Sequence, residues 1–285
     1  MLTTEADTTE SDGRLSVGDL VRMFEESEDA SLDARKDAER DRDYVDNKQL
    51  TAEELDVLAK RGQPPQIDNR IKTKVDYLVG LEKQQRVDPK ALPRTPLHEE
   101  DADGATQALR YVAETELFDN KRSGVWRNLL VEGCGGISVS VEPDYNGEMC
   151  IKLRRIAWDR MFYDPHSSET DFSDASYLGV VVWMDYADAL LQYPDRKDEL
   201  DVTMASVAHT DTYDDKPKFN VWADKKRKRV RICKMWIKRS DEWHFAEFTK
   251  GGILKAGPSP YKTDKGESDC ELFFQSAYVD RDNNR

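Results

Sequence analysis

The sequence predicts an α+β fold, with a helical half followed by a mostly antiparallel β half. Before residue 133 the apolar residues recur at the 3.6-residue period of amphipathic helices, and after it they recur at the period of two that half-buried strands show. A glycine-rich junction, residues 133–136, separates the two halves. We therefore expect a helical part over residues 14–132 and a β-rich part over residues 133–285.

The chain begins with an acidic segment. Residues 1–13 hold four acidic residues and no basic one, without an apolar period, so a disordered acidic tail is predicted there. Ser16 follows in a position to cap a short helix, because apolar residues that include Leu20 and Phe24 continue from it at helical spacing.

A strongly charged helix is predicted over residues 31–46, SLDARKDAERDRDYVD. Opposite charges alternate at i,i+4 spacing, which supports a helix, and Tyr44 and Val45 are its only bulky apolar anchors. A helix charged on almost every side faces solvent or lies between subunits.

The negative charge is concentrated at the start of the chain. Of a net charge of −14, residues 1–59 contribute −11 through 18 acidic and 7 basic residues, which leaves −3 for the remainder. A protein with this net negative charge does not bind DNA phosphates through its overall electrostatic field. The net negative charge is compatible with an acidic channel surface that repels a sliding DNA duplex.

Three further helical segments are predicted before the junction. Thr51 and Glu54 form a capping box that opens one helix, and Gly62 can adopt the left-handed conformation that ends it. Pro64 and Pro65 then force an extended passage to a helix over residues 71–85. A proline-rich loop leads to a long helix, or a helix pair, over residues 98–132. The helix over residues 71–85 places Ile71, Val75, Leu78 and Leu81 on one face. The residues expected to be buried over residues 98–132 are Ala105, Leu109, Val112, Leu117, Val125, Leu129 and Leu130.

The β half opens with alternating residues. Ile137, Val139 and Val141 alternate with Ser138 and Ser140, the pattern of a half-buried strand with its apolar side inward. A hairpin through Asn146-Gly147 joins this strand to the next. The remaining predicted elements are strands over residues 149–156, 177–184, 230–238, 244–249 and 270–278, and a helix over residues 186–193.

Composition excludes several classes of protein. Charged residues make up 35% of the chain, and no apolar run approaches the roughly 20 residues of a membrane-spanning helix. The start has no basic and apolar signal-peptide pattern. The four cysteines are far apart, which argues against a zinc site or a disulfide framework. We expect no cofactor, no membrane partner and no catalytic triad.

One acidic cluster could carry metal chemistry. Asp159, Asp164, His166 and Asp171 offer carboxylate and imidazole groups that suit a divalent metal, which makes a metal-dependent phosphoesterase or nuclease the alternative function. The favoured interpretation is structural: Asp164-Pro165-His166 is a turn in which short polar side chains cap backbone groups. The spacing matches no familiar metal motif.

A dense basic run is the second candidate for function. It could contact phosphates or the acidic face of a neighbouring subunit, although a solvated hairpin turn that leads into the next strand is the favoured interpretation. The run comprises Lys225, Lys226, Arg227, Lys228 and Arg229, with Arg231 just beyond it.

Several segments, in order, resemble one family: the portal, or head-to-tail connector, proteins of short-tailed bacteriophages of the Salmonella podovirus type. The similar segments are 39–44 (ERDRDY), 60–65 (KRGQPP), 69–72 (NRIK), 74–82 (KVDYLVGLE), 89–96 (PKALPRTP), 155–167 (RIAWDRMFYDPHS), 171–175 (DFSDA) and 183–185 (WMD). They correspond to the outer wing region of such a subunit. By this resemblance we expect the stem and clip of the family to be absent from the sequence given.

The resemblance implies a structural protein without enzymatic activity. Members of the family form a dodecameric ring at one capsid vertex, where the terminase docks and double-stranded DNA passes through the channel without sequence-specific binding. Scaffolding protein, coat protein and a tail adaptor are further partners. The implied location is the virion, and the host bacterial cytoplasm during assembly. A capsid adaptor that forms no ring is a second alternative.

Ring formation implies a heterologous contact, in which one face of a subunit is complementary to a different face of the next. The candidate pair is the acidic N-terminal helices and the basic run. Its candidate interface residues are Arg35, Glu39, Asp43, Lys225, Lys226, Arg227, Lys228 and Arg229.

Overall fold

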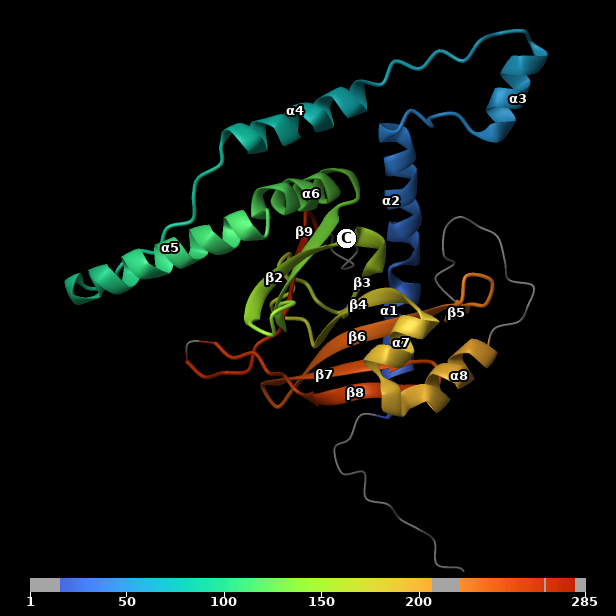
Figure 1. Ribbon diagram of the computed structural model, residues 1–285. Coiled ribbons are helices and arrows are strands. Elements are labelled where there is room, and N and C mark those ends of the chain that lie inside the picture. Colours follow the sequence, from blue (N-terminus) through green and yellow to red (C-terminus); the bar gives the residue numbers. More distant parts are fainter. Residues whose placement is uncertain (1–15, 207–220, 264, 280–285) are drawn as a thin grey trace, which may run out of the picture.

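A computed structural model describes residues 16–206, 221–263 and 265–279; the predicted tail over residues 1–13 and the end of the chain lie outside this range. The fold is α+β, as predicted, with helices first and antiparallel strands after them (Figure 1). The helices are α1 Val17–Ala30, α2 Leu32–Val45, α3 Ala52–Lys60, α4 Arg70–Gln84, α5 Glu99–Thr115, α6 Phe118–Val131, α7 Tyr186–Gln192 and α8 Lys197–Ala205.

The strands form two antiparallel sheets. The smaller sheet has the strand order β2-β1-β9, and the larger has the order β3-β4-β6-β7-β8 with β5 paired to β6. The strands are β1 Cys134–Pro143, β2 Met149–Ile156, β3 Met161–Tyr163, β4 Tyr177–Asp185, β5 Ala223–Asp224, β6 Arg229–Arg239, β7 Glu242–Thr249, β8 Gly252–Pro258 and β9 Leu272–Ser276.

The local start and stop signals operate where the sequence predicts them. The Ser16 hydroxyl accepts a hydrogen bond from the backbone of α1, and Thr51 and Glu54 form both bonds of a capping box at the start of α3. Gly62 has φ +65°, in the left-handed region that glycine enters without steric cost. The predicted hairpin between β1 and β2 is also present, with Gly147 at φ +80°.

Helix α1 belongs to the core of the larger sheet, although the strands that it contacts come more than a hundred residues later. Leu20 and Phe24 are fully buried, and the Phe24 ring meets the rings of Phe162 at 4.9 Å and Trp222 at 5.4 Å in edge-on geometry. Helices α7 and α8 pack on the same sheet and bury a separate cluster around Leu200 and Ile232.

A further apolar cluster joins the two sheets. It includes Met161 and Leu178 of the larger sheet and Phe274 of the smaller one. Close packing at β4 requires glycine, because a Cβ atom on Gly179 would lie 2.0 Å from the ring of Phe162.

The burial of side chains along strand β1 differs from the predicted pattern. Ser138 and Ser140 are buried, whereas Ile137 and Val139 are half-buried and Val141 is 45% exposed. The serine side of β1 faces the larger sheet, and helix α6 covers the apolar side only near the start of β1, where Val125 contacts Gly135. The alternation was predicted correctly, but the side that faces the interior was not.

The long helices also expose residues that were expected to be buried. Leu109 and Leu117 are 48% and 62% exposed, and Ile71 and Leu78, on the predicted apolar face of α4, are 45% and 37% exposed. Ala105 is exposed as well. The reason is visible in Figure 1, where α4 and α5 extend beside the sheets instead of lying flat on them.

Candidate subunit-contact surfaces

Arg35, one of the predicted interface residues, is buried within the subunit. Its Nε donates to Ser31 at 2.9 Å, and its guanidinium donates to the carbonyl oxygens of Asp159 at 3.1 Å and of Met161. Burial lowers the pKa of Arg35. A residue held in this way joins α2 to β3 and offers little surface to a neighbour.

Glu39 and Asp43 lie further along α2, where both side chains are half-buried. Asp43 forms an ion pair with Lys48 at 3.5 Å at the end of the helix. Exposed ion pairs of this kind contribute little to stability, so Asp43 can exchange Lys48 for another cation at small cost.

The basic run forms the turn between β5 and β6, as the favoured interpretation predicted. Lys226, Arg227 and Lys228 are exposed, and the Asp224 carboxylate accepts a hydrogen bond from the Arg227 backbone at 2.9 Å. Arg229 pairs with Asp185 at 3.2 Å on the neighbouring strand. The turn presents its positive charge outward, and the base of the turn is neutralised within the sheet.

Arg231 and Glu28 form a buried ion pair, with side chains 3% and 7% exposed. The guanidinium lies 4.5 Å from the centre of the Phe24 ring and 5.6 Å from that of Trp222. Burial raises the pKa of Glu28, although Arg231 opposes that rise. The acidic first helix and the basic strand therefore meet inside one subunit, where their charges neutralise each other.

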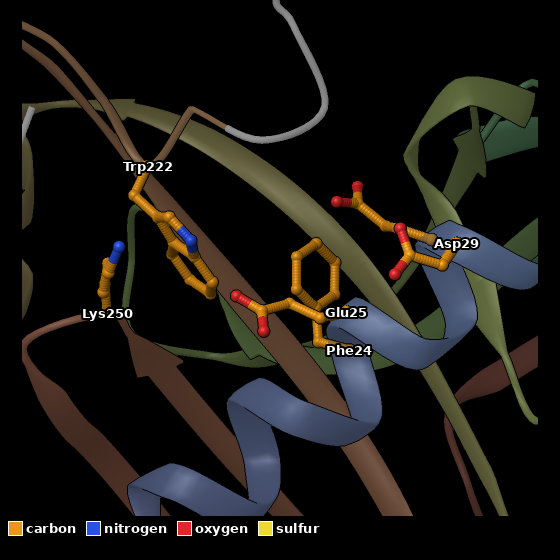
Figure 2. Close-up of a pocket in the computed structure, with 6 residues that line it drawn as sticks. Phe24, Glu25, Asp29, Trp222 and Lys250 are labelled. Atoms are coloured by element: carbon orange, nitrogen blue, oxygen red, sulfur yellow. The ribbon is translucent and has the colours of Figure 1, made fainter. Parts of the chain in front are cut away.

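A cavity of about 300 Å³ lies beside this ion pair. Figure 2 shows Glu25 and Asp29 of α1 on one side of it, and Trp222 and Lys250 on the other. The acids occupy the C-terminal half of α1, where the helix dipole disfavours negative charge. Because the walls carry charges of both signs, the cavity selects no single class of ligand.

The four candidate metal ligands do not converge. Asp164 is buried and accepts hydrogen bonds from the backbones of His166 at 2.9 Å and Ser176 at 3.0 Å, while Asp171 caps a separate turn through Ser173. Within the described residues, no three His, Cys, Asp or Glu side chains are arranged to hold a metal ion. The cluster containing Asp159 is therefore a set of capped turns, and the geometry lends no support to the metal-dependent alternative.

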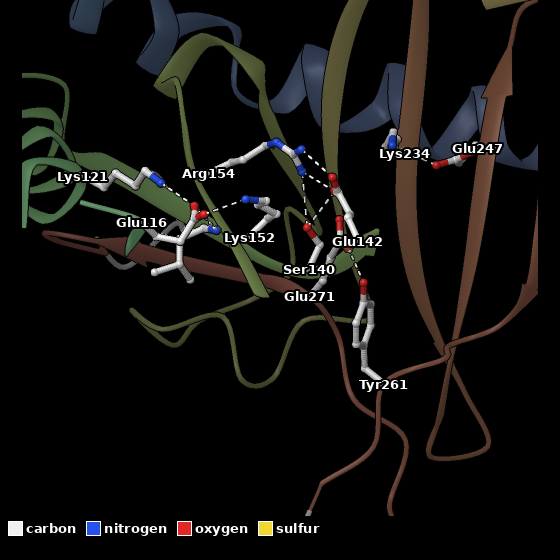
Figure 3. Close-up of polar contacts among 11 residues, drawn as sticks. Glu116, Lys121, Ser140, Glu142, Lys152, Arg154, Lys234, Glu247, Tyr261 and Glu271 are labelled. Atoms are coloured by element: carbon white, nitrogen blue, oxygen red, sulfur yellow. Dashed lines mark hydrogen bonds and ion pairs between the residues drawn. The ribbon is translucent and has the colours of Figure 1, made fainter. Parts of the chain in front are cut away.

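Polar groups fill part of the space between the two sheets, a feature that sequence reasoning missed. Figure 3 shows Arg154 of β2 donating to Glu142 of β1, with one bond of 2.6 Å. The hydrogen bonds from Arg154 lower the pKa of Glu142 to about 2. Across the gap, Lys234 and Glu247 pair at 3.0 Å on the larger sheet. The buried Ser140 hydroxyl belongs to the same polar group, since it donates to Glu142 at 2.9 Å and accepts from Arg154 at 3.3 Å.

Two carboxylates join helices to neighbouring elements: Glu82 links α4 to α6, and Glu116 links the end of α5 to β2. Glu82 of α4 accepts from Arg122 of α6 at 2.8 Å, and Glu116 accepts from Lys152 of β2 at 3.0 Å. Burial alone would raise the pKa of Glu82, but hydrogen bonds from Arg86, Ser123 and Arg122 outweigh it and lower the pKa to about 2. These ion pairs help to position α4 and α5, and a small apolar cluster of Val45, Val75 and Val131 packs α4 against α2 and α6.

Helix α3 makes the least contact of the helices described. It has no buried residue, and Leu55 and Val57 are 41% and 44% exposed. Asn69 holds the base of this projection, because its side-chain amide donates to the carbonyl oxygens of Tyr44 at 2.9 Å and Val45 at 3.0 Å. The segment between these residues therefore leaves the subunit and returns to the same point.

Comparisons with known proteins identify the class. A family model described as Phage P22-like portal protein matches residues 21–284. The portal protein of Helicobacter pylori bacteriophage KHP30 is 22% identical over 248 residues, which cover 85% of this chain and 37% of that protein. These matches define a structural protein of bacteriophages.

The chain belongs to the P22-like portal protein family. This confirms the resemblance drawn from the short segments in the sequence. The chain spans well under half of the length of the phage relative that it matches. Among the residues described by the structure, no helix has the length and apolar character needed to cross a membrane.

Proposed function

We propose that the chain is the wing region of a portal subunit, which assembles as a dodecameric ring at one capsid vertex. In this role the ring is the conduit through which double-stranded DNA is packaged and later ejected, without sequence-specific binding. The terminase, scaffolding and coat proteins and a tail adaptor are the partners. The protein acts in the virion, after assembly in the host bacterial cytoplasm.

The observation that carries the proposal is the family match, which extends over almost the whole chain, from residue 21 to residue 284. The structure is compatible with it in two respects. The candidate metal ligands Asp164 and Asp171 cap turns, and apolar residues of α3 and α4 remain exposed, as expected of surfaces that become covered in an assembly.

Locating the protein in phage particles tests the proposal. The encoding gene would carry an epitope tag at its start, and antibody-gold would be located on purified particles by electron microscopy. We expect gold at a single vertex. A tagged coat protein, which should label the whole shell, is the control. Labelling over the shell, or particles without the tagged protein, would overturn the proposal.

The basic turn provides a second test in the same particles. Reversing the charge of Lys226 and Arg227 to glutamate should weaken ring assembly if the turn contacts an acidic neighbour, because the new contact would place like charges together. The amount of tagged protein per particle measures this. Unchanged incorporation would remove the turn from the interface and leave the vertex location unaffected.

A further inference from the structure

Helix α3 is a projecting arm whose helical form its own subunit does not stabilise. Its nine residues include none that is buried, and isolated helices shorter than about 12–15 residues are marginal in water. The capping box contributes only about 1 kcal/mol. Since Asn69 fixes the base of the arm to the end of α2, the arm is held in place and projects outward. A surface outside the described residues would complete it.

The arm presents apolar side chains together with negative charge. Leu55 and Val57 are exposed, and Glu53 and Asp56 form no ion pair with any residue that the structure describes. A complementary surface would be apolar with positive charge at its margin.

The outer face of the smaller sheet has this character. Antiparallel register places Val141 opposite Ile151, and Ile137 opposite both Phe273 and Arg155, so these side chains share the face that α6 covers only in part. The exposed apolar residues on it are Val141 at 45%, Met149 at 66%, Ile151 at 44% and Phe273 at 52%. Arg155 is exposed at the edge of the same face.

We infer that α3 of one copy packs on the outer face of the smaller sheet of the next copy. In Figure 1, α3 and β2 lie on opposite sides of the subunit, as a heterologous contact between successive copies requires. The acidic residues of α3 meet Arg155, and Leu55 covers the apolar strands. This inference rests on the proposed function and names the surfaces by which neighbouring copies join.

Cross-linking between differently tagged copies tests the contact. One copy carries Leu55→Cys and the other Ile151→Cys, and a short bis-maleimide is added to the mixture. We expect a mixed dimer that contains both tags. Leu191→Cys, an 81% exposed position on α7, replaces Ile151→Cys as the matched control and should give no more product than the wild-type cysteines.

A second measurement needs no introduced cysteine. Hydrogen exchange of the α3 amides should slow as protein concentration rises, because packing on a neighbour stabilises the helix. Leu55→Glu should remove this dependence and weaken self-association at least about tenfold, the equivalent of about 1.4 kcal/mol. Copies of this variant should keep the wild-type monomer stability, since Leu55 is not buried within its own subunit.

The outcomes separate this contact from the proposed function. Copies that associate without a cross-link between positions 55 and 151 would overturn the contact and leave a ring formed through other surfaces. A cross-link within one chain carrying both cysteines would assign the sheet face to its own arm and overturn the contact as well. Monomers without cross-link at any concentration would also overturn it, whereas the vertex location is decided independently by gold labelling.

Discussion

Replacing Arg231 by methionine should loosen α1 from the larger sheet. Methionine has a similar length and an apolar character suited to the rings of Phe24 and Trp222, but it leaves the Glu28 carboxylate without its buried partner. The change therefore removes one charge while keeping most of the packing volume.

The expected cost is large relative to the stability of a typical domain. Removing one partner of a buried ion pair costs about 3–5 kcal/mol, against a total stability of about 5–15 kcal/mol. This cost applies to the Arg231–Glu28 pair because the two side chains are only 3% and 7% exposed. Loss of the two cation–π contacts adds roughly 1 kcal/mol.

Chemical denaturation of the single and double variants measures this cost. Glu28→Leu combined with Arg231→Met replaces the pair by apolar groups, and it should recover most of the lost free energy of unfolding because no uncompensated charge remains. Glu28→Leu alone completes the double-mutant cycle, and in this variant the buried Arg231 guanidinium lacks its carboxylate partner.

The pH dependence gives an independent check. In Arg231→Met the pKa of Glu28 should rise further above its ordinary value of 4.5, because burial then acts without the opposing arginine. The folded variant binds a proton that the unfolded chain has lost, so the deficit is small below about pH 4.5 and grows as the pH rises. A deficit under about 1 kcal/mol at pH 8, or a double variant as unstable as the single one, would refute the reasoning.

Three further predictions concern other buried contacts. Burial raises the pKa of Glu132 to about 7. Glu132→Gln should therefore stabilise the fold above pH 7 by roughly 1–2 kcal/mol, allowing for solvent screening, and should have no effect below about pH 4.5. Thermal unfolding across this pH range measures the change in stability. The opposite sign is expected for Glu82→Gln, which should cost roughly 1 kcal/mol at pH 7 and progressively less as the pH falls from about 4.5 to about 2, because the folded pKa is about 2; equal loss at all pH values would contradict the assignment. Gly179→Ala should cost at least about 2 kcal/mol in urea denaturation, since its Cβ would lie 2.0 Å from the Phe162 ring, and the milder Phe162→Leu in the same background should recover part of the loss.

Local signals in the sequence predicted much of the helical half. The capping residues Ser16 and Thr51 act through hydrogen bonds to their own helix, so their effect does not depend on distant residues. Turn glycines such as Gly147 are equally local. The resemblance also depended on short segments, and the family match over residues 21–284 confirms it.

Burial was harder to predict, because it depends on what covers a surface. Alternation in β1 specifies two faces but not which one meets the other sheet. Ser138 and Ser140 are buried, and Ser140 takes part in hydrogen bonds with Glu142 and Arg154. The burial of Arg35 was also not predictable from local sequence. A charged helix predicts solvent exposure, yet this arginine is buried because carbonyl oxygens of a distant segment accept its hydrogen bonds.

Helix α8 and strand β8 were not predicted from the sequence. The segment KDELDVTMA has a mixed charge pattern, and its helix is placed by a tertiary contact: the Thr203 hydroxyl donates to the Glu199 carbonyl within the helix and accepts from the Thr249 hydroxyl of β7. Strand β8 is short and glycine-bounded, and it forms only because β7 offers an edge for pairing. Tertiary contacts override weak local preference in both cases.

The corner between α1 and α2 has a mechanical consequence. The Ser27 hydroxyl donates to the Tyr163 carbonyl at 2.7 Å and accepts from the Tyr163 amide at 3.0 Å, and Arg35 bonds two further carbonyls of the same short segment. A pulling force on the arm passes down α2 into these bonds. Because they are loaded in parallel, they must break together, and the force is delivered to β3 at the edge of the larger sheet.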